Sequence, residues 1–455
     1  MRNLFEGIFQ LILRVFFREI EIVGEENVPA DGPVVFVSNH PNALLDPFFL
    51  LCRSPRQVVF LAKEPLFRMP LVGRLVKAFG SLPVYRKQDG ANPKDNAKTI
   101  AACRAALEGG QAIALFPEGT THSEPGLKPL KSGAARIALS ANSSGDRRGD
   151  LSIVPAGLYY SAKRTFRSEA SLVYGAPIAV PVVELDESHE PPRDDAHALT
   201  AQIDAALRGV TVQANNQDAL AIAHVAERIF AAAERDEAGA QDAEEHPGKG
   251  AVFEEMNLRQ RLVDGYEALA EAHPAELAAA VASIDAYEAQ IERHHLSHRY
   301  PSKLTVGAVV TEALHALFMM LALAPLAVPG WVLNYLPYRL VGTLSKRASS
   351  GEEVVATMKV LAAMLIFPLT WIGSAAAVFV WVDPLMALAV LLINPIAAFV
   401  TLVAVERIGQ LIRGARFVVL ALFRPGQKDL LVAERKAIRI MILHLAELAD
   451  ALPSE

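Results

Sequence analysis

Residues 34–46 read Val-Val-Phe-Val-Ser-Asn-His-Pro-Asn-Ala-Leu-Leu-Asp, and this stretch decides the fold. The apolar run 34–37 follows a turn-forming segment at 29–33 and predicts a buried strand. Pro41 is suited to the first turn of a helix, because its missing N–H has no partner there. We therefore expect His40 at a strand-to-helix junction, a common position for a reactive side chain on a rigid scaffold.

A carboxylate, Asp46, follows His40 by six residues. A carboxylate that binds a histidine ring fixes its tautomer and stabilises the imidazolium, which is what a general base requires. The same residues also suit a capping histidine or a buried histidine whose polar atoms are satisfied by the core. The stretch alone leaves these interpretations open.

The first 180 residues alternate strand and helix signals. Continuous apolar runs such as 112–116 are typical of central strands that are covered on both faces. The alternation predicts one α/β domain with a mixed, mainly parallel sheet flanked by helices. The expected strands cover 19–23, 34–37, 58–61, 80–87, 112–116, 151–154, 171–175 and 178–183, with helices over 66–79, 96–109 and 134–140.

Candidate binding residues follow several of these strands. Ligands of such sheets lie beyond the carboxyl ends of the strands, so these residues are expected at one edge. They are His40, Arg86, Glu118 and Pro155. Arg86 and Lys87 form a cation pair suited to a phosphate, the arginine by its fork and the lysine as a point charge. Two solvated surface cations would have the same sequence.

Length and composition limit the kind of protein. A chain of 455 residues suggests two or three domains. A net charge of −6 excludes a chain-wide polycation, so no nucleic-acid partner is expected. Two cysteines give neither a disulfide framework nor a zinc pattern. His294, His295 and His298 have helical spacing, but we expect the solvated end of a helix there and no metal site.

The last third of the chain predicts membrane helices. Residues 306–333 contain one charge, and 360–382 and 384–405 contain none, so each is long enough to cross a hydrocarbon core of about 30 Å. Basic residues flank the first and last of these segments. These basic flanks lie on the same side of the membrane only if the chain crosses it an even number of times. Pro325 and Pro329 therefore predict two legs, followed by a hairpin that turns at residues 383–384.

The order of these segments predicts the domain organisation. A helix over 2–17 has a wide apolar face flanked by arginines, which suits either a membrane interface or the core of its own domain. The α/β domain is expected on the cytoplasmic face of the membrane, because no signal peptide is evident. The expected segments are an interfacial helix (1–18), the α/β domain with a helical tail (19–233), an acidic linker and helices (234–303), membrane helices ending in a basic interfacial helix (304–424), and a C-terminal helix (425–455).

Together these features favour one reaction. No Gly-x-Ser-x-Gly or Gly-x-x-x-x-Gly-Lys motif occurs, so His40 is expected to remove a proton directly from a substrate hydroxyl. The cation pair suggests a phosphorylated acceptor, and the membrane segments suggest an apolar co-substrate or product. Acyl transfer to a glycerol phosphate meets all of these demands.

Four ordered blocks resemble a known family. They are Asn39-His40-Pro41 through Asp46, Gly80 through Arg86, Phe116-Pro117-Glu118-Gly119-Thr120, and Ile153-Val154-Pro155-Ala156. Roughly residues 18–180 are similar to the PlsC-like glycerolipid acyltransferases, which include glycerol-3-phosphate and 1-acylglycerol-3-phosphate acyltransferases. The longer organisation resembles the fungal-type glycerol-3-phosphate/dihydroxyacetone-phosphate acyltransferases, with their helical extension and membrane-embedded C-terminal part.

The resemblance implies a role for each matching residue. His40 would deprotonate the acceptor hydroxyl with Asp46 as its orienting partner, and the oxygen would attack the acyl thioester without a covalent enzyme intermediate. The implied binding residues are Arg86 and Lys87 for the acceptor phosphate, Glu118, Gly119 and Thr120 for the acceptor site, and Pro155 for the donor wall. The implied partners are membrane lipid, a glycerol-phosphate acceptor and an acyl donor. Acyl-CoA or acyl-carrier protein would be the co-substrate, and no cofactor is expected.

One departure from the family concerns the spacing of His40 and Asp46. The common pattern has four intervening residues, and this chain has five, as in the fungal-like branch. Six positions turn through about 240° on an ideal helix, so the segment must be partly non-helical for the pair to form. Two alternatives remain open. A non-catalytic lipid-binding or membrane-remodelling protein would not need Asp46, and an acyltransferase with a non-phosphate acceptor would not need Arg86.

Overall fold

The structure is a computed structural model. It describes residues 2–69, 72–85, 90, 96–144, 149–163, 165–238, 251–296, 306–349, 351 and 354–452. The chain divides into two compact units, which we describe separately. The first contains Met1–Gln213, Gly248–Asn257 and Ser350–Thr357, and the second contains Ala214–Pro247, Leu258–Ser349 and Met358–Glu455.

The first unit is built on an eight-stranded mixed sheet. Its strand order is β1-β7-β6-β2-β5-β3-β4, with β8 paired to β6. Strands β2 to β6 run parallel to one another, whereas β6 pairs antiparallel with β7 and β8. The predicted fold class is therefore confirmed. The strands are β1 Phe17–Val23, β2 Val34–Ser38, β3 Val58–Lys63, β4 Leu82–Val84, β5 Ala112–Leu115, β6 Ser152–Tyr160, β7 Ser168–Tyr174 and β8 Ile178–Ala179.

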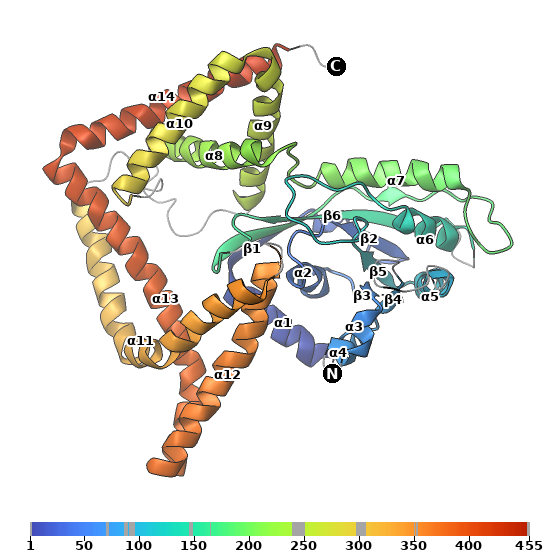
Figure 1. The fold of residues 1–455 in the computed structure, drawn as a ribbon, viewed down its shortest axis with the longest axis horizontal. Helices are drawn as coiled ribbons and strands as arrows, with labels where there is room; N and C mark the ends of the chain where they lie inside the picture. Colours follow the sequence, from blue (N-terminus) through green and yellow to red (C-terminus); the bar gives the residue numbers. More distant parts are fainter. Residues whose placement is uncertain are drawn as a thin grey trace. The chain divides into compact units, whose positions relative to one another are not determined.

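Helices cover both faces of this sheet, as Figure 1 shows. One face bears α5 Asn96–Glu108, α6 Gly133–Asn142 and α7 Arg193–Arg208. The other bears α1 Arg2–Phe16, α2 Leu45–Arg53, α3 Pro65–Arg68 and α4 Val72–Ala78. Alternate residues of β2 serve the two layers: Val35 and Val37 join the core under α5–α7, and Phe36 faces the opposite side, where it lies beside Tyr174.

Helix α1 packs on α2, and Phe9, Leu13 and Phe16 are buried. This face of the helix therefore covers the core of its own unit, which was one of the two expected roles. Leu11 on another face is 62% exposed. Its insertion into a membrane interface stays a prediction.

The prediction of a single helix over 66–79 is wrong. The structure has α3 and α4 instead, and Met69 between them is extended, with φ −72° and ψ 133°. Residue 70 is a proline, and the residue before a proline avoids the helical conformation because of the clash with the ring. Gly80, after α4, has φ +67°, the left-handed conformation that is common just beyond the end of a helix.

The second unit consists of helices. They are α8 Gln217–Ala238, most of α9 Ala251–Ala272, α10 Pro274–Arg293, α11 Val306–Ala348, α12 Val355–Trp381, α13 Pro384–Phe423 and α14 Pro425–Asp450. Helices α8, α10 and α14 pack together around Phe230, Tyr287 and Ile438. This packing explains why α8 is not the tail of the α/β domain expected over 19–233. The expected acidic linker lies largely outside the described residues.

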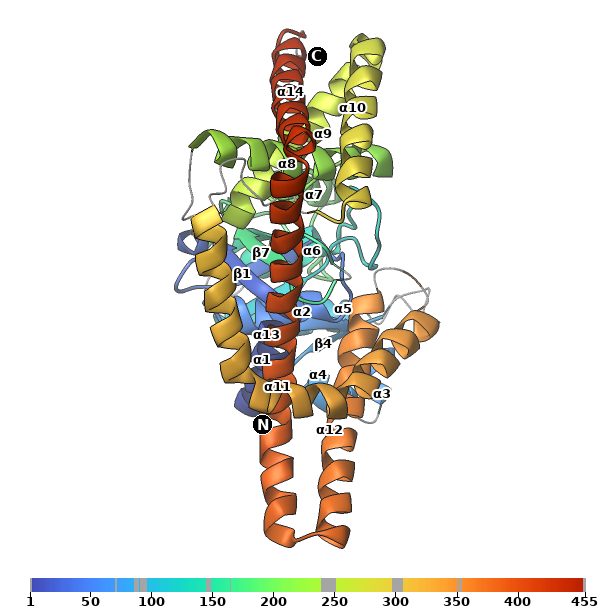
Figure 2. The same ribbon diagram turned by 90° about the vertical axis from the view of Figure 1, so that its left-hand side faces the viewer.

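Three helices are long and apolar enough to cross a membrane: the Leu317–Ala348 part of α11, α12, and the Pro384–Leu420 part of α13. The two legs expected on either side of Pro325 and Pro329 are joined in one continuous helix, α11, which contains both prolines and Pro337. It bends partway along its length, as Figure 2 shows. The turn at Asp383 is confirmed, and its carboxylate caps α13. The basic helix expected over 407–424 is the last part of α13 rather than a separate element.

Candidate active site

The end of β2 places His40 at the carboxyl edge of the sheet. Ser38 is the last residue of β2 and pairs with Ala156 of β6. The Asn39 side chain then continues this ladder: its Nδ2 donates to Leu158 O at 2.9 Å, and its Oδ1 accepts from Leu158 N at 2.7 Å. Because the side chain takes over the pairing, the backbone is free to leave the sheet at the next residue, His40.

A bend, not a helix, connects His40 to Asp46. Helix α2 begins at Leu45, so the expectation that Pro41 occupies the first helical turn is wrong. Ala43 has φ +38°, which breaks the helical progression. As a result, the pair forms despite the extra residue, with His40 Nδ1 2.8 Å from Asp46 Oδ2.

Asp46 is fully buried and held from three sides. Its Oδ2 also accepts from Asn42 N at 2.7 Å, and its Oδ1 accepts from the Tyr160 hydroxyl at 2.6 Å. Burial raises the pKa of Tyr160 well above its usual value, and the charge of Asp46 and the hydrogen bond to it add to the rise. The phenol therefore stays protonated as a donor throughout the neutral range.

The His40 ring is fixed by stacking as well as by hydrogen bonding. It lies on the Phe116 ring with centroids 3.9 Å apart and an interplanar angle of 6°. The side chain keeps 17% of its surface exposed. Its second ring nitrogen, Nε2, has no hydrogen-bond partner among the residues that the structure describes. An accessible nitrogen on an immobilised ring is the geometry that proton transfer requires.

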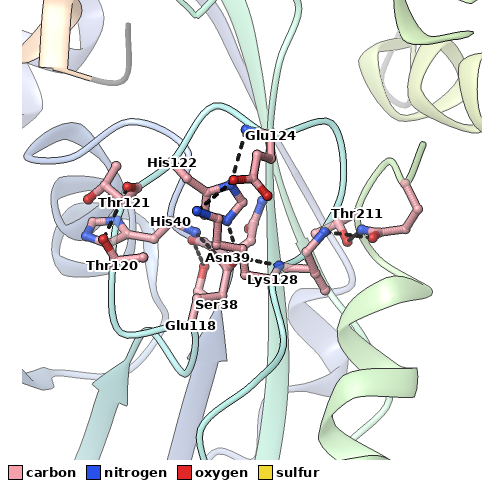
Figure 3. A network of polar contacts seen from close by, with 12 residues as sticks. Ser38, Asn39, His40, Glu118, Thr120, Thr121, His122, Glu124, Lys128 and Thr211 are labelled. Atoms are coloured by element: carbon pink, nitrogen blue, oxygen red, sulfur yellow. Dashed lines mark hydrogen bonds and ion pairs between the residues drawn. The ribbon is translucent and has the colours of Figure 1, made fainter. Parts of the chain in front are cut away.

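Glu118 lies in the loop that follows β5 and connects this loop to His40. Its Oε1 accepts from His40 N at 3.1 Å, and its Oε2 accepts from Lys128 N at 3.0 Å. His122 Nε2 makes a further short contact with Oε2. Figure 3 shows His40 leaving β2 beside this loop. Because the carboxylate is only 3% exposed and binds groups of its own chain, it positions His40 rather than presenting an open surface.

Gly119 and Thr120 continue the same loop. Gly119 has φ +69°, and a Cβ added there would lie 2.4 Å from Lys131 Nζ. The Lys131 side chain therefore crosses directly over the glycine, beside the start of α6. Thr120 is exposed and donates to Thr121 O at 3.4 Å.

The other predicted binding residues lie elsewhere or outside the description. Pro155 was expected to follow a strand. It lies instead within β6, opposite Val37, and is buried. Strand β6 continues through the proline, from Ser152 to Tyr160. Arg86 and Lys87 lie outside the described residues. The strand before them, β4, ends at Val84 on the sheet margin, where Asn96 bonds both backbone groups of Tyr85.

Two residues of the site were missed in the sequence. Tyr160 was missed because the strand was expected to stop at residue 154, and a strand carried on to 160 would have placed its hydroxyl at the correct edge. His122 follows Glu118 by four residues, and this spacing was a usable signal. No group of three metal-ligating side chains occurs within the described ranges. Burial raises the pKa of both Cys52 and Cys103 to about 12, so neither is a thiolate at neutral pH.

Comparison with known proteins defines the class of these regions. A family model described as Acyltransferase matches residues 19–159, which contain His40, Asp46 and Glu118. A second, described as Glycerol-3-phosphate acyltransferase 2 C-terminal domain, matches residues 249–448. The chain therefore contains an acyltransferase domain of the PlsC-like type. Its acyltransferase domain is followed by the C-terminal domain of the fungal-type glycerol-3-phosphate acyltransferases, as the longer resemblance implied.

Individual proteins are similar to parts of this chain. Glycerol-3-phosphate O-acyltransferase 1 of Saccharomyces cerevisiae is 26% identical, over 79% of this chain and 59% of its own length. A chloroplastic 1-acyl-sn-glycerol-3-phosphate acyltransferase of Brassica napus is 32% identical, over 27% of this chain and 34% of its own. The crystal structure of PlsC from Thermotoga maritima aligns with 46% of this chain and 78% of its own, at 17% identity and a TM-score of 0.35. The chain spans about half the length, 44–59%, of three fungal relatives that it matches.

Proposed function

We propose that the protein is a membrane-bound glycerolipid O-acyltransferase. It moves a fatty acyl group from acyl-CoA or acyl-carrier protein to the hydroxyl of a glycerol-3-phosphate-type acceptor. The observation that carries the proposal is the His40–Asp46 contact, in which a buried carboxylate binds one ring nitrogen while the other has no partner among the described residues.

The chemistry follows from this arrangement. With Nδ1–H donated to Asp46, Nε2 carries the lone pair and accepts the proton of the acceptor hydroxyl. The oxygen attacks the thioester carbonyl carbon, a C–O bond forms and the C–S bond breaks. The thiolate then takes the proton from the His40 imidazolium, so the products are an ester and a free thiol. No covalent acyl-enzyme and no cofactor are required.

The remaining residues are proposed to bind the substrates. Arg86 and Lys87 bind the acceptor phosphate, because adjacent cations after a strand suit that group. Glu118, Gly119 and Thr120 shape the acceptor site, with Glu118 acting through the His40 backbone. Pro155 contributes to the donor wall. The apolar helices α11–α13 hold the protein in the membrane with its α/β domain on the cytoplasmic face.

The proposal is tested with the full chain in lipid nanodiscs. Labelled acyl-CoA and acyl-carrier protein are each offered with glycerol 3-phosphate, dihydroxyacetone phosphate, 1-acylglycerol 3-phosphate and unphosphorylated glycerol. We expect transfer to at least one phosphorylated acceptor and little to glycerol, and Arg86→Ala should raise KM for the phosphorylated acceptor. Lipid binding without transfer to any acceptor would instead support a non-catalytic lipid-binding protein. Equal use of glycerol would contradict the assignment of the phosphate site.

A further inference from the structure

The bend between His40 and Asp46 is held by a residue 313 positions away. Leu44 N donates to Thr357 Oγ1 at 3.0 Å. Thr357 lies in the first turn of α12, which begins at Val355. Residues Ser350–Thr357 belong to the same compact unit as His40, so this contact lies within the catalytic unit.

The backbone of the bend requires support from outside. Asn42 N donates to Asp46, and Leu45 N donates to Asn42 O, so both of these groups find partners within the bend. Leu44 N is the group that receives its acceptor from another element. Between them Ala43 has φ +38°, a conformation that costs free energy for any residue with a Cβ and persists only where the surroundings fix it.

The surroundings of Thr357 make the contact a strong one. Thr357 is 7% exposed and Ala356 is completely buried, so the acceptor of the Leu44 N–H is largely shielded from water. A threonine further along α12 behaves differently. The Thr370 hydroxyl donates to Ile366 O one turn back in the same helix, the usual arrangement for a helical threonine.

We propose that Thr357 is a positioning residue for the His40–Asp46 pair, so that the start of α12 completes the catalytic bend. The kinetic part of this inference rests on the proposed acyltransferase function. A shift of the first turn of α12 away from the bend would remove the acceptor of the Leu44 N–H.

Three full-chain variants in nanodiscs test the inference. Thr357→Val removes the hydroxyl and keeps the shape, Thr357→Ser restores the hydroxyl, and Thr370→Val makes the same change where no catalytic bend is touched. Steady-state acyl transfer gives kcat and KM, and hydrogen exchange followed by mass spectrometry reports the amides of residues 41–46. Thermal unfolding of each sample shows whether the variant is folded.

Thr357→Val is expected to lower kcat about tenfold with KM within about twofold, since a small misplacement of a catalytic group is costly. Exchange at the bend should accelerate about tenfold, while Thr357→Ser and Thr370→Val stay near wild type. If Thr357→Val does not fold, Thr357→Ala is measured with the same expectation. Wild-type kcat and exchange in the folded hydroxyl-free variant, or the same losses in Thr370→Val, would overturn the inference. If wild-type protein transfers no acyl group, the proposed function fails, but the exchange result still decides whether Thr357 holds the bend.

Discussion

Two of the buried polar networks in the described residues are alike in burial and different in how they end. In the α/β unit, His40, Asp46 and Tyr160 form one of them. In the apolar helices of the second unit, Asn334 and Asn394 are only 5% and 3% exposed, and Asn334 Nδ2 donates to Asn394 Oδ1 at 3.2 Å. Both networks place polar groups where water is excluded, which is costly unless the groups are paired.

The network of the apolar helices is closed. Trp371 Nε1 donates to Asn334 Oδ1 at 2.9 Å, and Asn394 Nδ2 donates to Ser374 Oγ at 3.1 Å. It therefore ties α11, α12 and α13 together. The network of the α/β unit instead ends at His40 Nε2, which has no partner in the described part of the chain. Both regions bury polar groups, but only the network with His40 ends in a nitrogen that is left to take part in proton transfer.

The largest effect is expected for the atom on which the catalytic network ends. His40→Ala should lower acyl transfer about 10²–10⁴-fold, because the general base is lost while the backbone contact with Glu118 remains. Radiolabelled product formation measures this rate. His444→Ala is the matched control, since His444 faces Glu447 on an exposed surface of α14 and should transfer at the wild-type rate. Activity near wild type in the His40 variant would remove the distinction between the two networks.

A smaller loss of activity is expected at Gly119, because the loop beside His40 requires a positive φ at this residue. Gly119→Ala strains a φ of +69° and pushes a Cβ into the Lys131 side chain. The free energy of unfolding should fall by roughly 1–2 kcal/mol, and kcat should fall about tenfold as the loop that carries Glu118 shifts. Gly133→Ala, where an added Cβ meets nothing within 4 Å, serves as the control. Thermal unfolding and kcat are measured on both, and equal behaviour would contradict the prediction.

A milder effect is expected for the outer member of the catalytic network. Tyr160→Phe removes one donor from Asp46 but leaves Asn42 N and His40 in place. We expect kcat to fall about threefold and stability to fall by about 1–3 kcal/mol, because a buried carboxylate oxygen loses its partner. Tyr159→Phe is the control, since its hydroxyl binds Glu255 instead. A Tyr160 variant with full stability would argue against this contact.

The closed network should affect stability without affecting catalysis. Asn334→Leu leaves the Trp371 N–H and Asn394 Oδ1 without their partner, which should cost about 1 kcal/mol within a membrane. We expect a lower Tm in nanodiscs and an unchanged kcat. Thr343→Val on the same helix is the control, because its hydroxyl donates to Arg339 O one turn back in its own helix. A large loss of kcat in folded Asn334→Leu would show that the closed network also takes part in the reaction.

Much of the site could be predicted, because the end of a buried strand is visible in the sequence as the point where an apolar run stops. The apolar runs that end at Ser38 and Leu115 placed His40 and Glu118 at one edge, and parallel pairing brought those ends together. Arg86 and Lys87 could be assigned only from their residue types and from the family resemblance. They stay predictions.

The rest depended on interactions that no local pattern encodes. The positive φ at Ala43 could not be predicted, because alanine has no preference for this conformation. The side-chain ladder of Asn39 and the contact of Thr357 with Leu44 join residues 119 and 313 positions apart. The sequence predicts that the strand ends before Pro155, whereas β6 continues to Tyr160, so the position of the Tyr160 hydroxyl was not predicted.

The central claim is that His40 and Asp46 act as one unit despite the five residues between them. A double-mutant cycle of His40→Ala, Asp46→Asn and the combined variant, with kcat measured in nanodiscs, tests it most directly. Groups that act as a unit lose their contribution only once, so the combined variant should be about as slow as His40→Ala alone. If the two losses multiply instead, the residues act independently, and the contact between them is not the basis of catalysis.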